Sequence, residues 1–212
     1  MSDVVAAFDV DGTLTTTDTF LPFIRNVAGP LRSVAVGVEV APLALAVAAG
    51  RADRDDLKAT VVRGTLGGRT LLGLHDAGRA HAARIERRWL REDTVARLRW
   101  HRREGHRTVL VSASLRFYLA PLASSLGIDD VICTDLTVDA AGTHVTGELD
   151  GGNCRAQAKA DRLLALLGGR PGELWAYGDS SGDDALLALA DHPVRIRKGA
   201  FIAGVPLPGV DR

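Results

Sequence analysis

Val4-Val5-Ala6-Ala7-Phe8-Asp9-Val10-Asp11-Gly12-Thr13, near the start of this 212-residue chain, is the segment from which the architecture follows. An apolar run ends at Asp9 and is followed by the turn residues Asp11 and Gly12, the pattern of a buried strand with polar groups at its carboxyl end. Two carboxylates two positions apart can serve one site only if the backbone leaves strand geometry between them, which Gly12 permits. We therefore expect a strand over 4–8 that ends in a chemically active loop.

Beyond residue 105 the chain alternates between strands and helices. The apolar patterns predict strands at 108–111, 131–133, 174–177 and 194–196, helices at 117–126, 156–167 and 183–190, and a small hairpin over 135–138 and 144–147. Such alternation is typical of an α/β fold with a doubly wound, Rossmann-like, mostly parallel sheet covered on both faces. Ligands of these sheets collect at the carboxyl ends of the strands.

Residues 17–104 have a different pattern. They are rich in Ala, Leu, Arg and Val at helical spacing, with breaks at Gly29-Pro30, Gly50 and Gly67-Gly68, which predicts four or five helices. We expect a helical cap over 17–104, inserted into a core domain formed by 1–16 and 105–212. His75, His81, His101 and His106 are interpreted as polar-face residues of the cap helices.

One cap segment is unusually apolar. Val34 to Ala49 contains no polar residue except Glu39, and it is too short for the roughly 20 residues that span a bilayer. The favoured interpretation is a buried pair of helices broken at Pro42. The alternative is a weak membrane-surface contact, assisted by Arg32, Arg51 and Arg54 at the flanks.

Composition limits the function classes. Hydrophobic residues are 46% and charged residues 25%, as in ordinary globular proteins, and 26 basic residues balance 26 acidic ones. That balance gives no sign of nucleic-acid binding, which needs a basic excess. The two cysteines form neither a disulfide framework nor a zinc motif, and no secretory signal pattern opens the chain, so we expect a cytoplasmic protein. The sequence does not predict an oligomeric state.

Polar residues follow three of the predicted strands, and a fourth candidate lies near the start of a predicted helix. Asp9 and Asp11 follow the first strand, and a carboxylate screened by a metal ion is a competent nucleophile toward phosphorus while its neighbour transfers protons. Ser112 follows the strand at 108–111, and Lys159 offers a point charge near a helix start. Gly178-Asp179-Ser180-Ser181-Gly182-Asp183-Asp184 follows the strand at 174–177 and supplies the oxygen ligands that Mg²⁺ prefers.

In this order and spacing, the four signals resemble the haloacid dehalogenase superfamily of phosphohydrolases, in its phosphoserine-phosphatase-like branch with a helical cap. The resemblance extends from Val4 to about Lys198. It also includes Leu14-Thr15 with Asp18-Thr19-Phe20, Val111-Ser112-Ala113-Ser114, and Gly152-Asn153-Cys154-Arg155 ahead of Lys159.

The resemblance implies a role for each matching residue. Asp9 is the expected nucleophile, Asp11 the general acid and base, and Thr13 a support of the loop. Ser112 and Lys159 are expected to hold phosphoryl oxygens. The expected cofactor is Mg²⁺, and its expected ligands are Asp9, Asp11, Asp179 and Asp183. Because Asp11 must be protonated in the first step, we predict that the site raises its pKa above the usual value of about 3.9.

The implied substrate is a small phosphomonoester such as phosphoserine or a related metabolite. Asp18 occupies the position where phosphoserine phosphatases carry a glutamate for the substrate amino group, and Phe20 and Ala113 are expected beside it. Arg63 or Lys58 is expected to meet a substrate carboxylate. The apolar cap keeps open a lipid phosphatase of the phosphatidylglycerophosphate type.

Two other classes compete. Gly178-Asp179-Ser180-Ser181-Gly182 also matches the G-x-S-x-G nucleophile elbow of serine esterases, but His192 is the single histidine downstream of it. A non-catalytic binding module is the other alternative, and intact functional side chains count against it. Dinucleotide and P-loop glycine motifs are absent from the sequence.

Overall fold

The computed structural model describes residues 3–197, so the last part of the predicted core, 198–212, lies outside the described residues. The strands are β1 (Val4–Phe8), β2 (Arg107–Leu115), β3 (Asp130–Val138), β4 (Val145–Asp150), β5 (Glu173–Gly178) and β6 (His192–Arg195). The helices are α1 (Phe20–Ala48), α2 (Arg54–Leu66), α3 (Leu71–Arg88), α4 (Glu92–Arg103), α5 (Arg116–Leu126), α6 (Gln157–Leu167) and α7 (Asp184–Leu189). Two short helical turns, η1 (Val10–Leu14) and η2 (Ser181–Asp183), follow β1 and precede α7.

Within residues 3–197 the strands form one six-stranded sheet in the order β4-β3-β2-β1-β5-β6. All neighbours are parallel except β3 and β4, which form the predicted antiparallel hairpin. Phe8 pairs with Leu110 on β2 and Tyr177 on β5, so the chain segments that leave these three strands start from one edge of the sheet. The predicted α/β fold with a mostly parallel sheet is confirmed, and the strand order reverses at β1, where a ligand site is expected.

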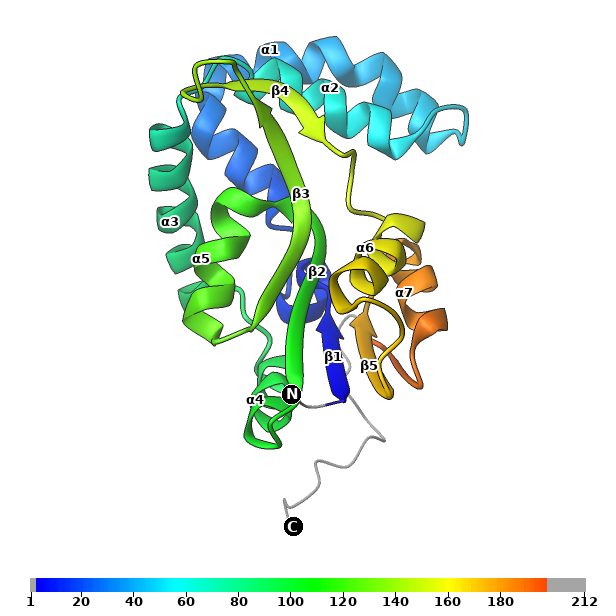
Figure 1. Ribbon diagram of the computed structural model, residues 1–212. Helices are drawn as coiled ribbons and strands as arrows, with labels where there is room; N and C mark the ends of the chain where they lie inside the picture. Colours follow the sequence, from blue (N-terminus) through cyan, green and yellow to red (C-terminus); the bar gives the residue numbers. More distant parts are fainter. Residues whose placement is uncertain (1–2, 198–212) are drawn as a thin grey trace.

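Successive side chains of β1 point to opposite faces of the sheet and feed two separate cores. Val5 and Ala7 pack with residues of α6 and α7, such as Leu163 and Leu186. Ala6 and Phe8 face the other side, where α4 and α5 cover the sheet and α3 packs on α5. Figure 1 shows this arrangement, with α6 and α7 on one face and α3, α4 and α5 on the other. Burial on both faces explains why β1 contains only apolar residues.

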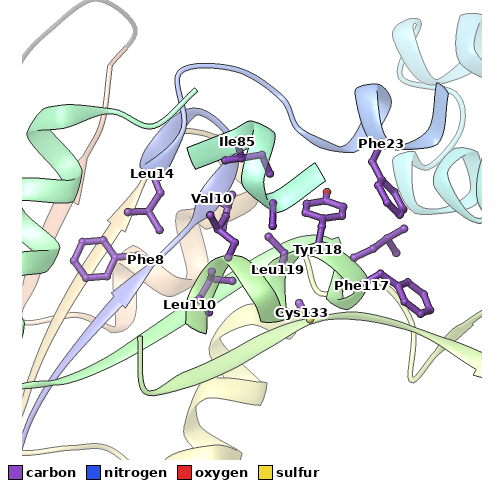
Figure 2. Close-up of a cluster of buried hydrophobic side chains, with 14 of the residues drawn as sticks. Phe8, Val10, Leu14, Phe23, Ile85, Leu110, Phe117, Tyr118, Leu119 and Cys133 are labelled. Carbon is purple, nitrogen blue, oxygen red and sulfur yellow. The ribbon is translucent and has the colours of Figure 1, made fainter. Parts of the chain in front are cut away.

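The larger core continues from the sheet into the helices that precede β2. Val10 and Leu14 of η1 and Phe23 of α1 are fully buried there, together with Tyr118 of α5 (Figure 2). Phe23 and Tyr118 are in contact at 4.9 Å between ring centroids, which ties the start of α1 to the core. The loop after β1 is therefore fixed on its inner side by apolar packing.

Four helices occupy the predicted cap region, as expected, but they have two kinds of neighbour. α1 and α2 pack on each other, and α2 also packs on β4, at the carboxyl end of the sheet (Figure 1). α3 packs chiefly on α5, and α4 packs on β2. The domain boundary at residue 104 remains a prediction, and within the described residues it is α1 and α2 that stand over the strand ends.

The interpretation of 34–49 as a buried helix pair broken at Pro42 is wrong. α1 continues through Pro42 and is interrupted instead at Gly29, whose φ of 77° is not helical. Of the residues from 34 to 48, only Val36 and Val40 are buried, because α2 covers a single narrow side of the helix. The segment has apolar residues on every side of the helix. Sequence alone cannot show whether all of these sides are buried.

The interpretation of the histidines as polar-face residues is wrong for His81 and His101, which are both buried. The His81 ring lies at 2.9 Å from the Thr19 carbonyl, and His101 lies at 2.9 Å from the Tyr177 hydroxyl. Burial is the largest cause that lowers the pKa of both, for His101 to about 3. These neutral rings anchor α3 to the start of α1 and α4 to β5.

Candidate active site

The loop after β1 brings the first carboxylate to the carboxyl edge of the sheet. The Asp9 N–H donates to the Tyr177 carbonyl at 2.9 Å, so Asp9 continues the pairing of β1 with β5. The chain then turns tightly through Gly12, whose φ is 85°, and closes with a bond from the Thr15 N–H to the Val10 carbonyl. The expected departure from strand geometry is confirmed.

Gly12 is required by a close approach as well as by its backbone angle. A Cβ at this position would lie 2.7 Å from Cγ of Asp179, well inside the contact distance. The absence of a side chain at Gly12 thus lets the loop after β5 meet the loop after β1. Gly178 has the same function toward Asp183, whose Cγ would lie 2.7 Å from a Cβ there.

Lys159 connects the loop after β1 with the loop after β5. Its ammonium donates to Oδ1 of Asp9 and to Oδ1 of Asp183, each at 2.6 Å, and all three side chains are buried. Burial lowers the pKa of Lys159, but the two carboxylates outweigh it, so the pKa lies above its ordinary value and the side chain stays charged. In this arrangement Lys159 holds two carboxylates, and its expected contact with phosphoryl oxygens remains a prediction.

The second oxygen of Asp183 organises the loop that carries Asp179. Its Oδ2 accepts from the Asp179 N–H at 3.2 Å, the Ser180 N–H at 3.0 Å and the Ser180 hydroxyl at 3.1 Å. Ser180 caps η2 in return by accepting from the Gly182 N–H. With both oxygens occupied by donors, Asp183 positions the cluster more than it offers a free ligand atom.

The three acids Asp9, Asp179 and Asp183 fit a divalent cation. One carboxylate oxygen from each lies within 4.8 Å of the others. Asp179 is half-buried and makes no side-chain ion pair within residues 3–197, so its carboxylate faces Asp9 across the Gly12 backbone. Carboxylate oxygens at a partly solvated edge suit Mg²⁺, which keeps several waters.

Packing acids together has an electrostatic consequence. Burial is the largest cause that raises the pKa of Asp9, and the negative charges of Asp183 and Asp11 add to it, so that the pKa reaches about 7 despite Lys159. Burial and Asp183 raise the pKa of Asp179 as well. One lysine does not neutralise this cluster, and a bound cation would restore the ionised form of Asp9.

Asp11 points away from that cluster toward the cavity. Its Oδ1 accepts from the N–H and the hydroxyl of Thr19, each at 2.6 Å, and its Oδ2 accepts from the Ser114 hydroxyl at 2.6 Å. These bonds lower its pKa, but burial and the nearby charge of Asp18 outweigh them and raise it. The predicted direction of the Asp11 shift is confirmed.

Ser112 and Thr13 lie at the same edge of the sheet. Ser112 follows the strand residues that pair with β1, is buried, and accepts a bond from the Ser114 N–H at 3.1 Å. Thr13 is fully buried, and its hydroxyl has no hydrogen-bond partner among the described residues. An unpaired buried hydroxyl of this kind is one that a bound water would satisfy.

A cavity of about 550 Å³ opens between this edge and the α1–α2 pair. Asp11, Ser114, Asp18, Phe20 and Ala113 are among the residues that line it, so the last three lie where a substrate contact was expected. α1 and α2 contribute an apolar part of its wall, formed by Leu21, Val40, Ala44, Val47, Leu57 and Val61, and further lining residues are polar or charged: Arg54, Asp55, Lys58, Asn153 and Arg155. Asp18 is exposed at its rim, where its Oδ1 also caps α1 by accepting from the Leu21 N–H at 3.0 Å.

Arg63 and Lys58 were the two cap residues expected to meet a substrate carboxylate. Lys58 lies at the cavity, and Arg63 does not. The Lys58 ammonium donates to the Ala113 carbonyl and to Oδ1 of Asn153, the latter at 2.6 Å. Burial lowers the pKa of Lys58 to about 8. Arg63 instead forms a bidentate, exposed pair with Glu148 of β4, with both bonds at 2.9 Å.

Several site residues had no role in the sequence interpretation. Thr19 and Ser114 hold Asp11, while Asn153 joins Lys58 to the core and donates to Asp55 at 2.7 Å. All three stood inside the quoted motifs, so the signal was present. The motifs do not show which residue contacts which, since Ser114 lies 103 positions from Asp11 in the sequence.

The serine-esterase alternative finds no support in the geometry. The Ser180 hydroxyl bonds Asp183, and His192 lies at the start of β6, opposite Trp175 and away from the carboxyl ends of the strands. Its ring is 2.9 Å from Glu173. Ser180 and His192 therefore cannot act on one substrate.

Three comparisons place the chain among known proteins. The family model described as haloacid dehalogenase-like hydrolase matches residues 6–188. The chain is 40% identical over 188 residues to Protein CicA of Caulobacter vibrioides, covering 89% of this chain and 83% of that protein. Among solved structures, a protein of unknown function from Bordetella pertussis Tohama I has a TM-score of 0.71 at 22% identity, covering 89% and 87% of the two chains. A phosphoserine phosphatase with a phospho-aspartyl intermediate analogue has a TM-score of 0.59 at 19% identity, covering 88% and 82%.

Proposed function

Because the chain belongs to the haloacid dehalogenase-like hydrolases, we propose that it is a Mg²⁺-dependent phosphatase that cleaves a phosphomonoester through an aspartyl-phosphate on Asp9. The observation that carries the proposal is the cluster of Asp9, Asp179 and Asp183 at the carboxyl edge of the sheet, with Lys159 paired to Asp9 and Asp183. Asp9 and Asp179 would bind the cation through carboxylate oxygens. Asp183 would lie behind them, and the backbone carbonyl oxygen of Asp11 would be a further ligand. When bound, the cation screens the negative charge of the phosphoryl group and of Asp9.

In the first step, a carboxylate oxygen of Asp9 attacks phosphorus, and the ester P–O bond breaks. Asp11 gives its proton to the departing oxygen, so that an alcohol leaves. The raised pKa of Asp11 supports this role, because it increases the protonated fraction near neutral pH. Ser112 and Lys159 bind phosphoryl oxygens, which places the charge that develops in the transition state near fixed donors.

In the second step, water attacks phosphorus of the aspartyl-phosphate. Asp11, now ionised, accepts a proton from that water, the bond between Asp9 and phosphorus breaks, and inorganic phosphate forms. Thr19 and Ser114 keep the Asp11 carboxyl pointed at the reacting oxygen in both steps. The hydroxyl donors to Asp11 can rotate as its protonation changes, which suits a group that alternates between acid and base.

The proposed substrate is a small-molecule phosphate such as phosphoserine or a related metabolite. A cavity of about 550 Å³ beside Asp11 has room for one, and Asp18 and Lys58 place charges of both signs at it. The apolar wall from α1 and α2 favours a second candidate, a phosphate ester with a hydrocarbon chain, such as the lipid phosphates of the phosphatidylglycerophosphate type. Location in the cytoplasm stays part of the proposal.

A phosphate-release screen tests the activity. Purified protein is assayed against amino-acid, sugar, nucleotide and lipid phosphates, with Mg²⁺ and with chelator, beside Asp9→Asn and Ser180→Ala. We expect Mg²⁺-dependent release that falls on the order of a thousandfold in Asp9→Asn and survives in Ser180→Ala. Absence of release on all substrates would favour the non-catalytic binding module, and loss of activity in Ser180→Ala alone would favour the esterase.

A further inference from the structure

The outer side of α1 carries a continuous apolar stripe, which we define as Leu31, Val34, Ala35, Val38, Ala41, Pro42, Leu45, Ala48 and Ala49. These residues recur every three or four positions and are all exposed. The four large ones are strongly so: Leu31 is 87%, Val34 67%, Val38 71% and Leu45 72% exposed. At about 1.5 Å per residue the stripe is about 27 Å long. Soluble monomers rarely expose contiguous apolar surface on this scale.

This stripe is not the back of a core helix. α1 has a window of 18 residues with mean hydropathy 1.7, and only 11% of that window is buried. By length and composition the helix could cross a membrane, yet its inner side is occupied along its length. Phe23 is fixed in the core, Val36 lies against Gly64 of α2, and the Arg32 Nε donates to the Gly64 carbonyl at 2.7 Å. α1 therefore lies along the molecule and presents one side outward (Figure 1).

We propose that the apolar stripe of α1 docks on the surface of an anionic lipid bilayer, with the helix lying in the plane of the interface. Apolar residues on one side and cations at the ends are what such a surface binds. From residue 20 to 52 the charged residues are Arg25, Arg32 and Arg51 against the single acid Glu39, and all four are exposed. Arg32 and Arg51 stand at the two ends of the stripe, where lipid headgroups would meet them, and Arg25 lies just before the break at Gly29.

Charge also argues for lipid over a second copy of this chain. Two stripes paired antiparallel about Val38 would bring the two Glu39 side chains together. A parallel pairing would oppose each charge with itself. Symmetric contacts of this kind bring like charges face to face, which costs free energy, whereas anionic headgroups complement all three arginines.

Docking would also place the candidate active site at the lipid surface. The opposite side of α1 contributes Val40, Ala44 and Val47 to the cavity that contains Asp11. One helix therefore separates the bilayer from the cavity. The docking itself rests on the stripe and its arginines and does not depend on the proposed phosphatase activity.

Vesicle flotation tests the proposal. The full chain is mixed at low salt with phosphatidylcholine vesicles containing phosphatidylglycerol, and with pure phosphatidylcholine vesicles. We expect it to float with the anionic vesicles, less with the neutral ones, and less at high salt. The double variant Leu31→Gln/Leu45→Gln should lose at least about tenfold in partitioning, because two leucines no longer leave water.

The matched control is Leu72→Gln/Leu166→Gln. These leucines are 72% and 40% exposed on α3 and α6, outside the stripe, so their replacement should leave flotation unchanged. Circular dichroism and thermal melting check that both variants fold. Failure of the wild type to float at low salt would overturn the proposal. So would a wild-type dimer in light scattering that Leu31→Gln/Leu45→Gln dissociates while neither protein floats, since the stripe would then cover a second copy.

Discussion

At the scale of single residues, Gly12 combines a left-handed backbone with a close approach. Its φ is 85°, and its Cα faces the carboxylate of Asp179. Any larger residue at this position both strains the turn and pushes Asp179 away from Asp9. Its effect on catalysis should therefore exceed what backbone strain alone would cause. Gly105 offers the comparison, because it has a φ of 74° and open space around it.

Gly12→Ala should lower the free energy of unfolding by about 1 kcal/mol through strain and reduce kcat at least about tenfold through misplacement of the acids. Gly105→Ala should lose a similar amount of stability and keep its kcat. Urea unfolding and phosphate release measure the two quantities. Equal kcat in both variants would show that the Gly12–Asp179 contact has no catalytic consequence.

The pair Asp11 and Asp18 makes a prediction about pH. The charge of Asp18 is one cause of the raised pKa of Asp11, after burial. Asp18→Asn should therefore lower the pKa of Asp11, so that the acid loses its proton at lower pH and the basic limb of the pH–rate profile moves to lower pH. Asparagine can still cap α1 at Leu21. Asp161→Asn, an exposed change on α6, is the control and should not move the profile.

At the scale of elements, Lys58 connects α2 to the strand ends. Its ammonium reaches the end of β2 through Ala113, β3 through Thr134 at 3.3 Å, and the loop before α6 through Asn153. Arg63, five positions later on α2, makes only an exposed ion pair with β4. The same helix thus carries one cation that joins three segments of the site and one that is solvated.

Lys58→Met should raise KM by about tenfold, since it leaves acceptors at Asn153 and Ala113 unsatisfied and loosens the cavity wall. Arg63→Met should change KM less than about twofold, because exposed ion pairs contribute little. Steady-state kinetics on the substrate found in the screen separates them. The reverse order would restore Arg63 as the substrate-binding residue of the cap.

Element by element, the sequence predicted what depends on local pattern. β1 was placed at 4–8 because five apolar residues end at an acid, and α6 ends at Leu167 because Gly168 adopts a left-handed cap. The continuation of α1 through Pro42 was not predictable. Proline lacks the N–H that would bond a carbonyl one turn earlier, but on the exposed side of a helix that carbonyl needs no partner from the protein. The pairing of Asp11 with Ser114 depends on tertiary packing, which no local pattern contains.

At the scale of the whole molecule, three acids are held together against their own repulsion. The fold brings Asp9, Asp179 and Asp183 from two loops into one cluster, and a formal net charge of zero offers no general compensation. A cation that binds only the folded state should therefore stabilise it. The effect follows the ratio of free ion to its dissociation constant, about 2.7 kcal/mol at a hundredfold excess.

We accordingly expect Mg²⁺ to raise the melting temperature by about 2–4 °C for each kcal/mol of binding. Asp179→Asn should remove this shift. Asp184→Asn should retain it, because Asp184 pairs with Arg195 outside the cluster. Differential scanning calorimetry with and without chelator gives the answer, and an unchanged shift in Asp179→Asn would place the ion elsewhere.

In the proposed reaction, the Asp9 carboxylate takes the phosphoryl group from the substrate, and this step leaves a covalent mark on the protein. The step is tested most directly by quenching the enzyme in acid during turnover and locating the phosphoryl group by peptide mass spectrometry. We expect a phosphorylated peptide modified at Asp9 in the wild type and none in Asp9→Asn. Phosphate on Ser112 or Ser180, or full turnover by Asp9→Asn with no modified peptide, would contradict it.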